Sequence, residues 1–91
     1  MDIGFLWDEE KEAVTRDKHN VDLEQAVEAI MDPDHLYEND PQGHWGRFIV
    51  VGRTRTGRLL HVIISDEGLP IVRLITAYDA ESRWRQEYEQ Q

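Results

Sequence analysis

Three strand-like segments that follow one another in the second half of the chain limit what it can fold into. Residues Arg47–Arg53, Arg58–Ser65 and Ile71–Tyr78 are rich in aliphatic and β-branched side chains, which favour strands. The short connection Arg55-Thr56-Gly57 suits a three-residue hairpin loop, because glycine adopts the left-handed conformation that such a loop needs. Since strands joined by tight loops pair antiparallel, these segments predict a meander at the centre of the fold.

Two capped helices are predicted before these strands. Asp8 is a good N-cap for a first helix, and Asn20 tolerates the left-handed conformation that ends one. Asp22 and Gln25 form a capping-box pair at the start of a second helix, whose apolar residues recur with helical spacing. Pro33 then ends that helix, because proline disfavours helical backbone in the residue before it.

Shorter elements complete the predicted order. Ile3–Trp7 reads as a first strand, His35–Glu38 as a short strand, and residues 39–43 as a loop. Asp79 is expected to cap a last helix that runs towards the C-terminus. The chain is therefore predicted to be an α+β protein of order β-α-α-β-β-β-β-α, with an antiparallel meander sheet and helices packed mainly on one face.

The length and composition set further limits. Ninety-one residues are enough for a single domain, expected to span residues 1–91. The chain has no cysteine and no apolar run of transmembrane length, and its acidic start lacks the basic flank of a signal peptide. We expect a cytoplasmic protein without membrane association. The histidines show no close metal-ligand spacing, and no phosphate loop is present, so no cofactor or metal is expected.

Charge is spread unevenly along the chain. Residues 1–44 contain 13 acidic residues against three basic ones, a net charge of −10, whereas residues 45–78 sum to +3 and residues 79–91 to −2. Because RNA affinity comes largely from cations that displace counterions from phosphates, the whole chain at −9 is a poor general RNA binder. RNA binding would require a local cluster of arginines.

The predicted hairpin brings such a cluster together. Residues that oppose one another directly point to the same side of a sheet, and the loop at Gly57 sets which residues these are. The residues then sharing one face are Arg47, Arg53, His61 and Ser65. If the next loop is Glu67-Gly68-Leu69, Arg73 opposes Ile63 and joins the same face, although a loop longer by one residue would reverse its side.

These side chains suit RNA cleavage by a 2′-hydroxyl group. The reaction needs a base, an acid and cations that face the charge on phosphorus. His19 and His61 are the candidate imidazoles, and Lys18, Arg53 and Arg73 are the candidate phosphate ligands. Each also has a structural interpretation. Lys18 and His19 could stabilise a helix end, His61 could be a bonded sheet histidine, and Arg73 could pair with a carboxylate of the acidic half.

Several motifs resemble the BrnT family of small toxins. Lys18-His19-Asn20 is similar to the Lys-His-Gly that ends the first helix in that family, and Gly57 before Arg58-Leu59-Leu60 matches its hairpin. The segment Arg73-Leu74-Ile75-Thr76-Ala77-Tyr78 resembles the last strand, Arg-x-Ile-Ser-Ala-Arg, with Tyr78 in place of the second arginine. The last helix carries fewer basic residues than is common there. The resemblance spans roughly residues 5 to 89.

The resemblance implies a RelE-like fold and the activity of a type II toxin. By this comparison the chain would be an endoribonuclease that needs no metal, with Lys18, His19, Arg53, His61 and Arg73 as site residues. Its partners would be RNA and a ribbon-helix-helix antitoxin of the BrnA kind, and the state as monomer or homodimer stays open. The alternative is a scaffold that has lost catalysis and acts as an acidic protein-interaction module.

Overall fold

The structure, a computed structural model, describes residues 3–40, 46–66 and 68–91 and forms one five-stranded sheet with three helices. In chain order the elements are β1 (Gly4–Trp7), α1 (Glu9–His19), α2 (Leu23–Ile30), β2 (Leu36–Asn39), β3 (Arg47–Arg53), β4 (Leu59–Ser65), β5 (Ile71–Asp79) and α3 (Ser82–Glu89). This is the predicted α+β order, although the predicted loop at 39–43 falls largely outside the described residues. None of the helices in the described part of the chain is long and apolar enough to cross a membrane.

The strand order β1-β5-β4-β3-β2 departs from an antiparallel meander at one edge. The pairs β2–β3, β3–β4 and β4–β5 are antiparallel, but β1 runs parallel to β5, with Gly4 opposite Ile71. The prediction of a purely antiparallel sheet is therefore wrong. Parallel neighbours need a long connection, and here the whole of α1 to β4 lies between the two strands. No local sequence signal records such a pairing.

The helix signals act as their sequences predict. The Asp8 side chain accepts hydrogen bonds from the backbone N–H groups of Glu10 and Lys11, and Asn20 ends α1 in the left-handed conformation with φ 54°. Asp22 and Gln25 form the complete capping box of α2. The last helix is the exception, because Asp79 belongs to β5 and Glu81 occupies the N-cap position without a side-chain bond.

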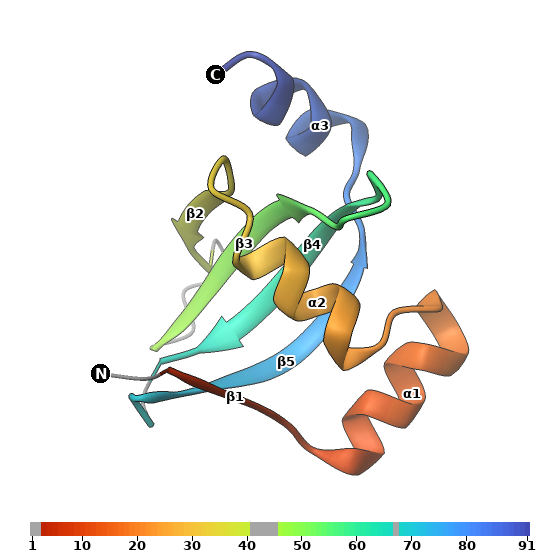
Figure 1. Cartoon of the computed structure of the whole chain (residues 1–91), viewed down its shortest axis with the longest axis vertical. Coiled ribbons are helices and arrows are strands. Elements are labelled where there is room, and N and C mark those ends of the chain that lie inside the picture. Colours follow the sequence, from red (N-terminus) through yellow and green to blue (C-terminus); the bar gives the residue numbers. More distant parts are fainter. Residues whose placement is uncertain (1–2, 41–45, 67) are drawn as a thin grey trace.

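The helices divide between the two faces of the sheet. Helix α2 crosses β3 and β4, where Ala26 and Ala29 pack in a fully buried core with Val50, Leu60 and Val62. Helix α1 runs along β5, and α3 lies apart from both at the other end of the molecule (Figure 1). The residues of the second core, where α3 meets the opposite sheet face, are Ile49, Val51, Leu59 and Trp84.

The β3–β4 register is the predicted one, with Arg53 opposite Leu59 and Arg47 opposite Ser65. The β4–β5 register differs, because Arg73 lies opposite Ser65 and not opposite Ile63 as expected. Five residues, 66–70, separate β4 from β5, two more than the predicted loop of 67–69. The register of the pair also shifts between Ile63 and Ile64. Since side chains alternate with a period of two, Arg73 still shares the face of Ser65.

Candidate functional site

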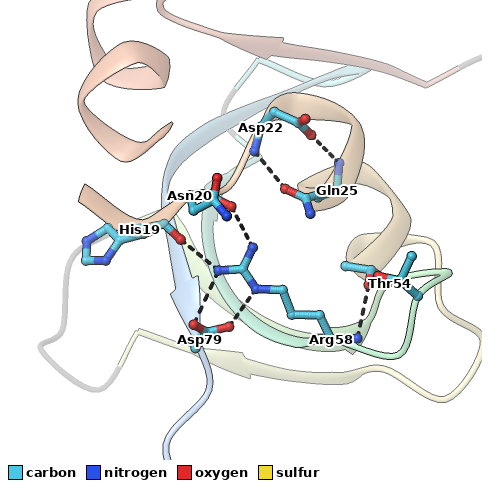
Figure 2. A network of polar contacts seen from close by, with 8 residues as sticks. His19, Asn20, Asp22, Gln25, Thr54, Arg58 and Asp79 are labelled. Carbon is cyan, nitrogen blue, oxygen red and sulfur yellow. Dashed lines mark hydrogen bonds and ion pairs between the residues drawn. The ribbon is translucent and has the colours of Figure 1, made fainter. Parts of the chain in front are cut away.

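The end of α1 is held against the sheet by Arg58 (Figure 2). Its Nη1 donates to the backbone oxygen of Asn20 at 2.6 Å and its Nη2 to that of His19 at 2.7 Å. Its Nε donates to Oδ1 of Asp79 at 2.7 Å. The last carbonyls of a helix lack hydrogen-bond partners within it and carry partial negative charge. The guanidinium supplies the missing donors and a positive charge. The hydrogen bond from Arg58 lowers the pKa of Asp79 below its ordinary value.

An aromatic row extends from this helix end across the sheet. The rings of His19 and Tyr78 lie 5.7 Å apart, and those of Tyr78 and His61 stack at 4.6 Å. Trp84 of α3 meets His61 edge-on at 5.6 Å. Because His61 and Tyr78 are direct partners across β4 and β5, their rings project from the same sheet face. The row joins α1, two strands and α3, and we call His19, Tyr78, His61 and Trp84 the ring row.

The two histidines of the ring row differ in exposure. His19 is exposed, whereas His61 is only 6% exposed and neither of its ring nitrogens has a hydrogen-bond partner. Burial lowers the pKa of His61 below its ordinary value, because a buried imidazolium loses its hydration. His61 is therefore neutral at pH 7 and closed off from solvent. Only His19 is placed to touch a substrate directly.

Cations lie at both ends of the ring row. Lys18 is exposed beside His19, and the exposed Arg83 places its guanidinium carbon 4.8 Å from the centroid of the Trp84 ring. Neither side chain forms an ion pair with another residue in the described part of the chain. These charges are therefore free to face an anion.

Arg53, at the end of β3, contacts α3 on the same sheet face as the ring row. Its guanidinium carbon lies 5.1 Å from the centroid of the Tyr88 ring, and its Nη2 is 4.0 Å from a carboxylate oxygen of Glu89. Its backbone N–H donates to Oδ2 of Asp32 at 2.7 Å, and the Tyr88 hydroxyl donates to the same oxygen at 2.6 Å. Arg53 thus takes part in fastening α3 to the loop after α2.

Arg73 lies on the same face but far from Arg53. Their partners on β4, Ser65 and Leu59, are six residues apart, which corresponds to about 20 Å along the strand. Arg73 is exposed and forms no ion pair within the described residues. The alternative of a pairing between Arg73 and a carboxylate of the acidic half is not seen among these residues. The five predicted site residues therefore do not meet at one point.

The structure adds residues that the sequence did not single out for the site. Tyr78 lies at the centre of the ring row, and Arg58 and Asp79 fix the helix end beside it. The partners of Arg58 are 21 to 39 residues away in the chain. Only the departure of Tyr78 from the family strand motif marks its position in the sequence. The described residues contain no group of three or more side chains placed to hold a metal ion.

The single mixed sheet, with a capped helix ending beside a tyrosine and two histidines, defines a small α+β protein. The family described as "Ribonuclease toxin, BrnT, of type II toxin-antitoxin system" matches residues 7–83, and the chain belongs to this family. The crystal structure of the Brucella abortus ribonuclease toxin BrnT is similar, with a TM-score of 0.67 and 17% identity. That match covers 89% of this chain and 100% of the other. No curated protein matches.

Proposed function

We propose that this protein is an endoribonuclease toxin that cleaves RNA at the end of α1, with His19 as the group that contacts the reacting atoms. The observation that supports this best is the exposed His19 ring beside Tyr78, on a helix end fixed by Arg58. A side chain must be held in a defined position to transfer a proton efficiently. The family of ribonuclease toxins supplies the reaction class.

In the proposed reaction, the imidazole of His19 accepts the proton of a ribose 2′-hydroxyl. The freed oxygen attacks the adjacent phosphorus, the bond to the 5′-oxygen breaks, and that oxygen takes a proton from solvent. The products are a 2′,3′-cyclic phosphate and a 5′-hydroxyl end. The exposed Lys18 ammonium stabilises the charge that develops on the phosphoryl oxygens.

The other predicted residues take different roles in this proposal. His61 stacks on the Tyr78 ring and does not reach the substrate, because its ring nitrogens are buried. Arg73, exposed and about 16 Å from Tyr78 along β5, is suited to another phosphate of the same RNA strand. Arg53 is occupied by Tyr88 and Glu89 and contributes through the position of α3.

The partner in this proposal is a DNA-binding antitoxin of the ribbon-helix-helix type, and the setting is the cytoplasm. A type II toxin family implies a protein antitoxin, and a chain of net charge −9 suits a basic partner. The competing proposal is a scaffold without catalysis that acts as an acidic interaction module. The pairing of Arg53, Arg55 and Arg58 with carboxylates favours it, because it removes cations from RNA binding.

Induced expression with measurement of growth and total mRNA separates these two functions. We expect growth arrest and mRNA loss with the parent chain. His19→Ala should lose both effects, because removing a general base lowers the cleavage rate by about 100-fold. Lys18→Ala should weaken cleavage, whereas Lys11→Ala, an exposed lysine in the first turns of the same helix, should not. Unaffected growth and intact mRNA with the parent chain would leave the interaction module.

A further inference from the structure

A groove of about 630 Å³ lies between α2 and the β3–β4 hairpin, away from the ring row. It is large enough for several side chains, since pockets of 300–1,000 Å³ accept drug-sized groups. The surfaces that form it are one side of α2, the turn after that helix, and the last residue of β3 with the loop that follows. None of these surfaces takes part in the proposed cleavage.

One wall of the groove is an apolar stripe. It consists of three residues spaced four apart, from the first residue of α2 to its C-cap: Leu23, Val27 and Met31. This spacing places them on one side of the helix. Met31 is 66% exposed, although the small core needs every apolar side chain it can bury. Methionine adapts its shape to a partner more readily than branched residues do. Leu23 also packs partly against the core, so Met31 is the part of the stripe best suited to binding a partner.

Beside this stripe lies a second one of carboxylates, Glu24, Glu28 and Asp32, with the same spacing. Glu28 pairs with Arg55, and Asp32 accepts bonds from Tyr88 and the backbone of Arg53. Glu24 is exposed and has no ion pair within the described residues. The groove is also lined by Arg53 and Arg55, and Arg55 pairs with Glu28, so three carboxylates face two guanidinium groups there. An apolar occupant would thus meet a free carboxylate at its side.

We propose that this groove binds a basic amphipathic helix of the partner protein, with apolar side chains on the stripe of Leu23, Val27 and Met31 and a lysine or arginine at Glu24. Helix-in-groove recognition uses anchors at this spacing, and charge complementarity selects the basic partner. The identification of that partner as the antitoxin rests on the proposed function. The binding itself does not require RNA cleavage.

The first test uses a helical Leu/Lys peptide of about five turns and its Leu/Glu counterpart, with affinities measured by fluorescence anisotropy. The full chain should bind the Leu/Lys peptide and not the Leu/Glu one. Met31→Asp should weaken binding at least about tenfold by putting a charge in the apolar stripe. Because that substitution makes the chain more acidic, mere charge attraction predicts tighter binding, which would overturn the proposal. Leu69→Asp is the matched control, because the Leu69 side chain is 60% exposed and lies outside the groove. This variant should bind the peptide with the affinity of the parent.

The second pair of variants tests the carboxylate. Glu24→Lys should weaken binding of the Leu/Lys peptide more than Glu9→Lys, an equal change in net charge on exposed α1. Equal effects of the two would contradict a defined site at the groove.

Co-expression with a ribbon-helix-helix antitoxin that neutralises the parent chain separates this proposal from the proposed function. Met31→Asp should remain toxic and escape neutralisation, whereas Leu69→Asp should remain toxic and be neutralised. Neutralisation of Met31→Asp at parent levels would overturn the antitoxin as occupant. A parent chain that is not toxic but still binds the peptide through Met31 would overturn the cleavage proposal alone.

Discussion

At the scale of single residues, two positions are set by what surrounds them and not by their own preferences. Gly52 in β3 lies so close to α2 that an added Cβ would stand 1.9 Å from the backbone oxygen of Ala29. His61 is buried with both nitrogens lacking partners. The first residue leaves no space for a side chain, and the second carries polar atoms that the fold does not use.

Gly52→Ala should destabilise the protein by about 2–3 kcal/mol, because the backbone of α2 must move away from the sheet to make room. Urea unfolding followed by circular dichroism measures the change. Gly4→Ala is the control, since its Cβ would meet only Ile71 Cγ1 at 3.9 Å, an ordinary contact. Equal stability of the two variants would show that α2 does not approach β3 as described.

His61→Phe should leave the stability unchanged or raise it. The substitution keeps a ring against Tyr78 and Trp84 and removes two buried polar atoms that have no partner. If His61 only supports Tyr78, growth arrest on induction should also persist in this variant. His61→Ala should lose about 2–4 kcal/mol through the cavity it leaves. A stable but inactive His61→Phe protein would instead assign chemistry to the imidazole.

At the scale of elements, α3 depends on a small number of fastening contacts. Tyr88 donates its hydroxyl proton to Asp32, and Trp84 covers the sheet face next to His61. Burial, together with the hydrogen bond to Asp32 and its charge, raises the pKa of Tyr88 to about 12. This link joins the last helix to the turn after α2, two segments 56 residues apart.

Tyr88→Phe should lower the free energy of unfolding by about 1–2 kcal/mol, through the loss of a part-buried hydrogen bond to a charged acceptor. Amide exchange should speed up in α3 while the amides of α2 keep their protection. Ultraviolet titration should also lose the tyrosine that ionises near pH 12. Tyr37→Phe, at a side chain 51% exposed, is the control and should change neither measurement of α3. Unchanged exchange in α3 would contradict the described fastening.

At the scale of the whole molecule, stability should fall as the solution becomes acidic. The folded pKa of His61 is lowered by burial, so the unfolded chain binds its proton more readily. The stability that His61 contributes is therefore present above its ordinary pKa, about 6.5, and is lost as the pH falls below it. Asp79, with its pKa lowered by Arg58, acts in the same direction below about pH 4. At Asp32, burial raises the pKa, but the hydrogen bonds that this carboxylate accepts lower it overall.

Urea unfolding at a series of pH values should therefore show two declines, one beginning near pH 6.5 and one near pH 4. His61→Phe should remove the first decline and leave the second. Asp79→Asn should reduce the second and leave the first. A single decline that neither substitution alters would show that these groups do not titrate in the environments described.

Local chemistry explains why so much of the fold could be predicted. The caps at Asp8 and Asp22, the stop at Asn20 and the hairpin at Gly57 each act within about four residues, and the β3–β4 register follows from that loop. The family motifs around Lys18 and Arg73 belong to the same short range. These are the parts of the structure that the order of residues alone determined.

Only the tertiary structure decided the rest, because it depends on segments that are distant in the chain. Two such contacts are the parallel pairing of β1 with β5 and the hydrogen bond from Arg58 to the end of α1, and each joins segments that are far apart along the chain. The shifted β4–β5 register separates Arg53 from Arg73 along the sheet and places Tyr78 between His19 and His61. A side chain's spacing along a strand fixes its face, but its neighbours on that face are fixed by packing across strands and helices.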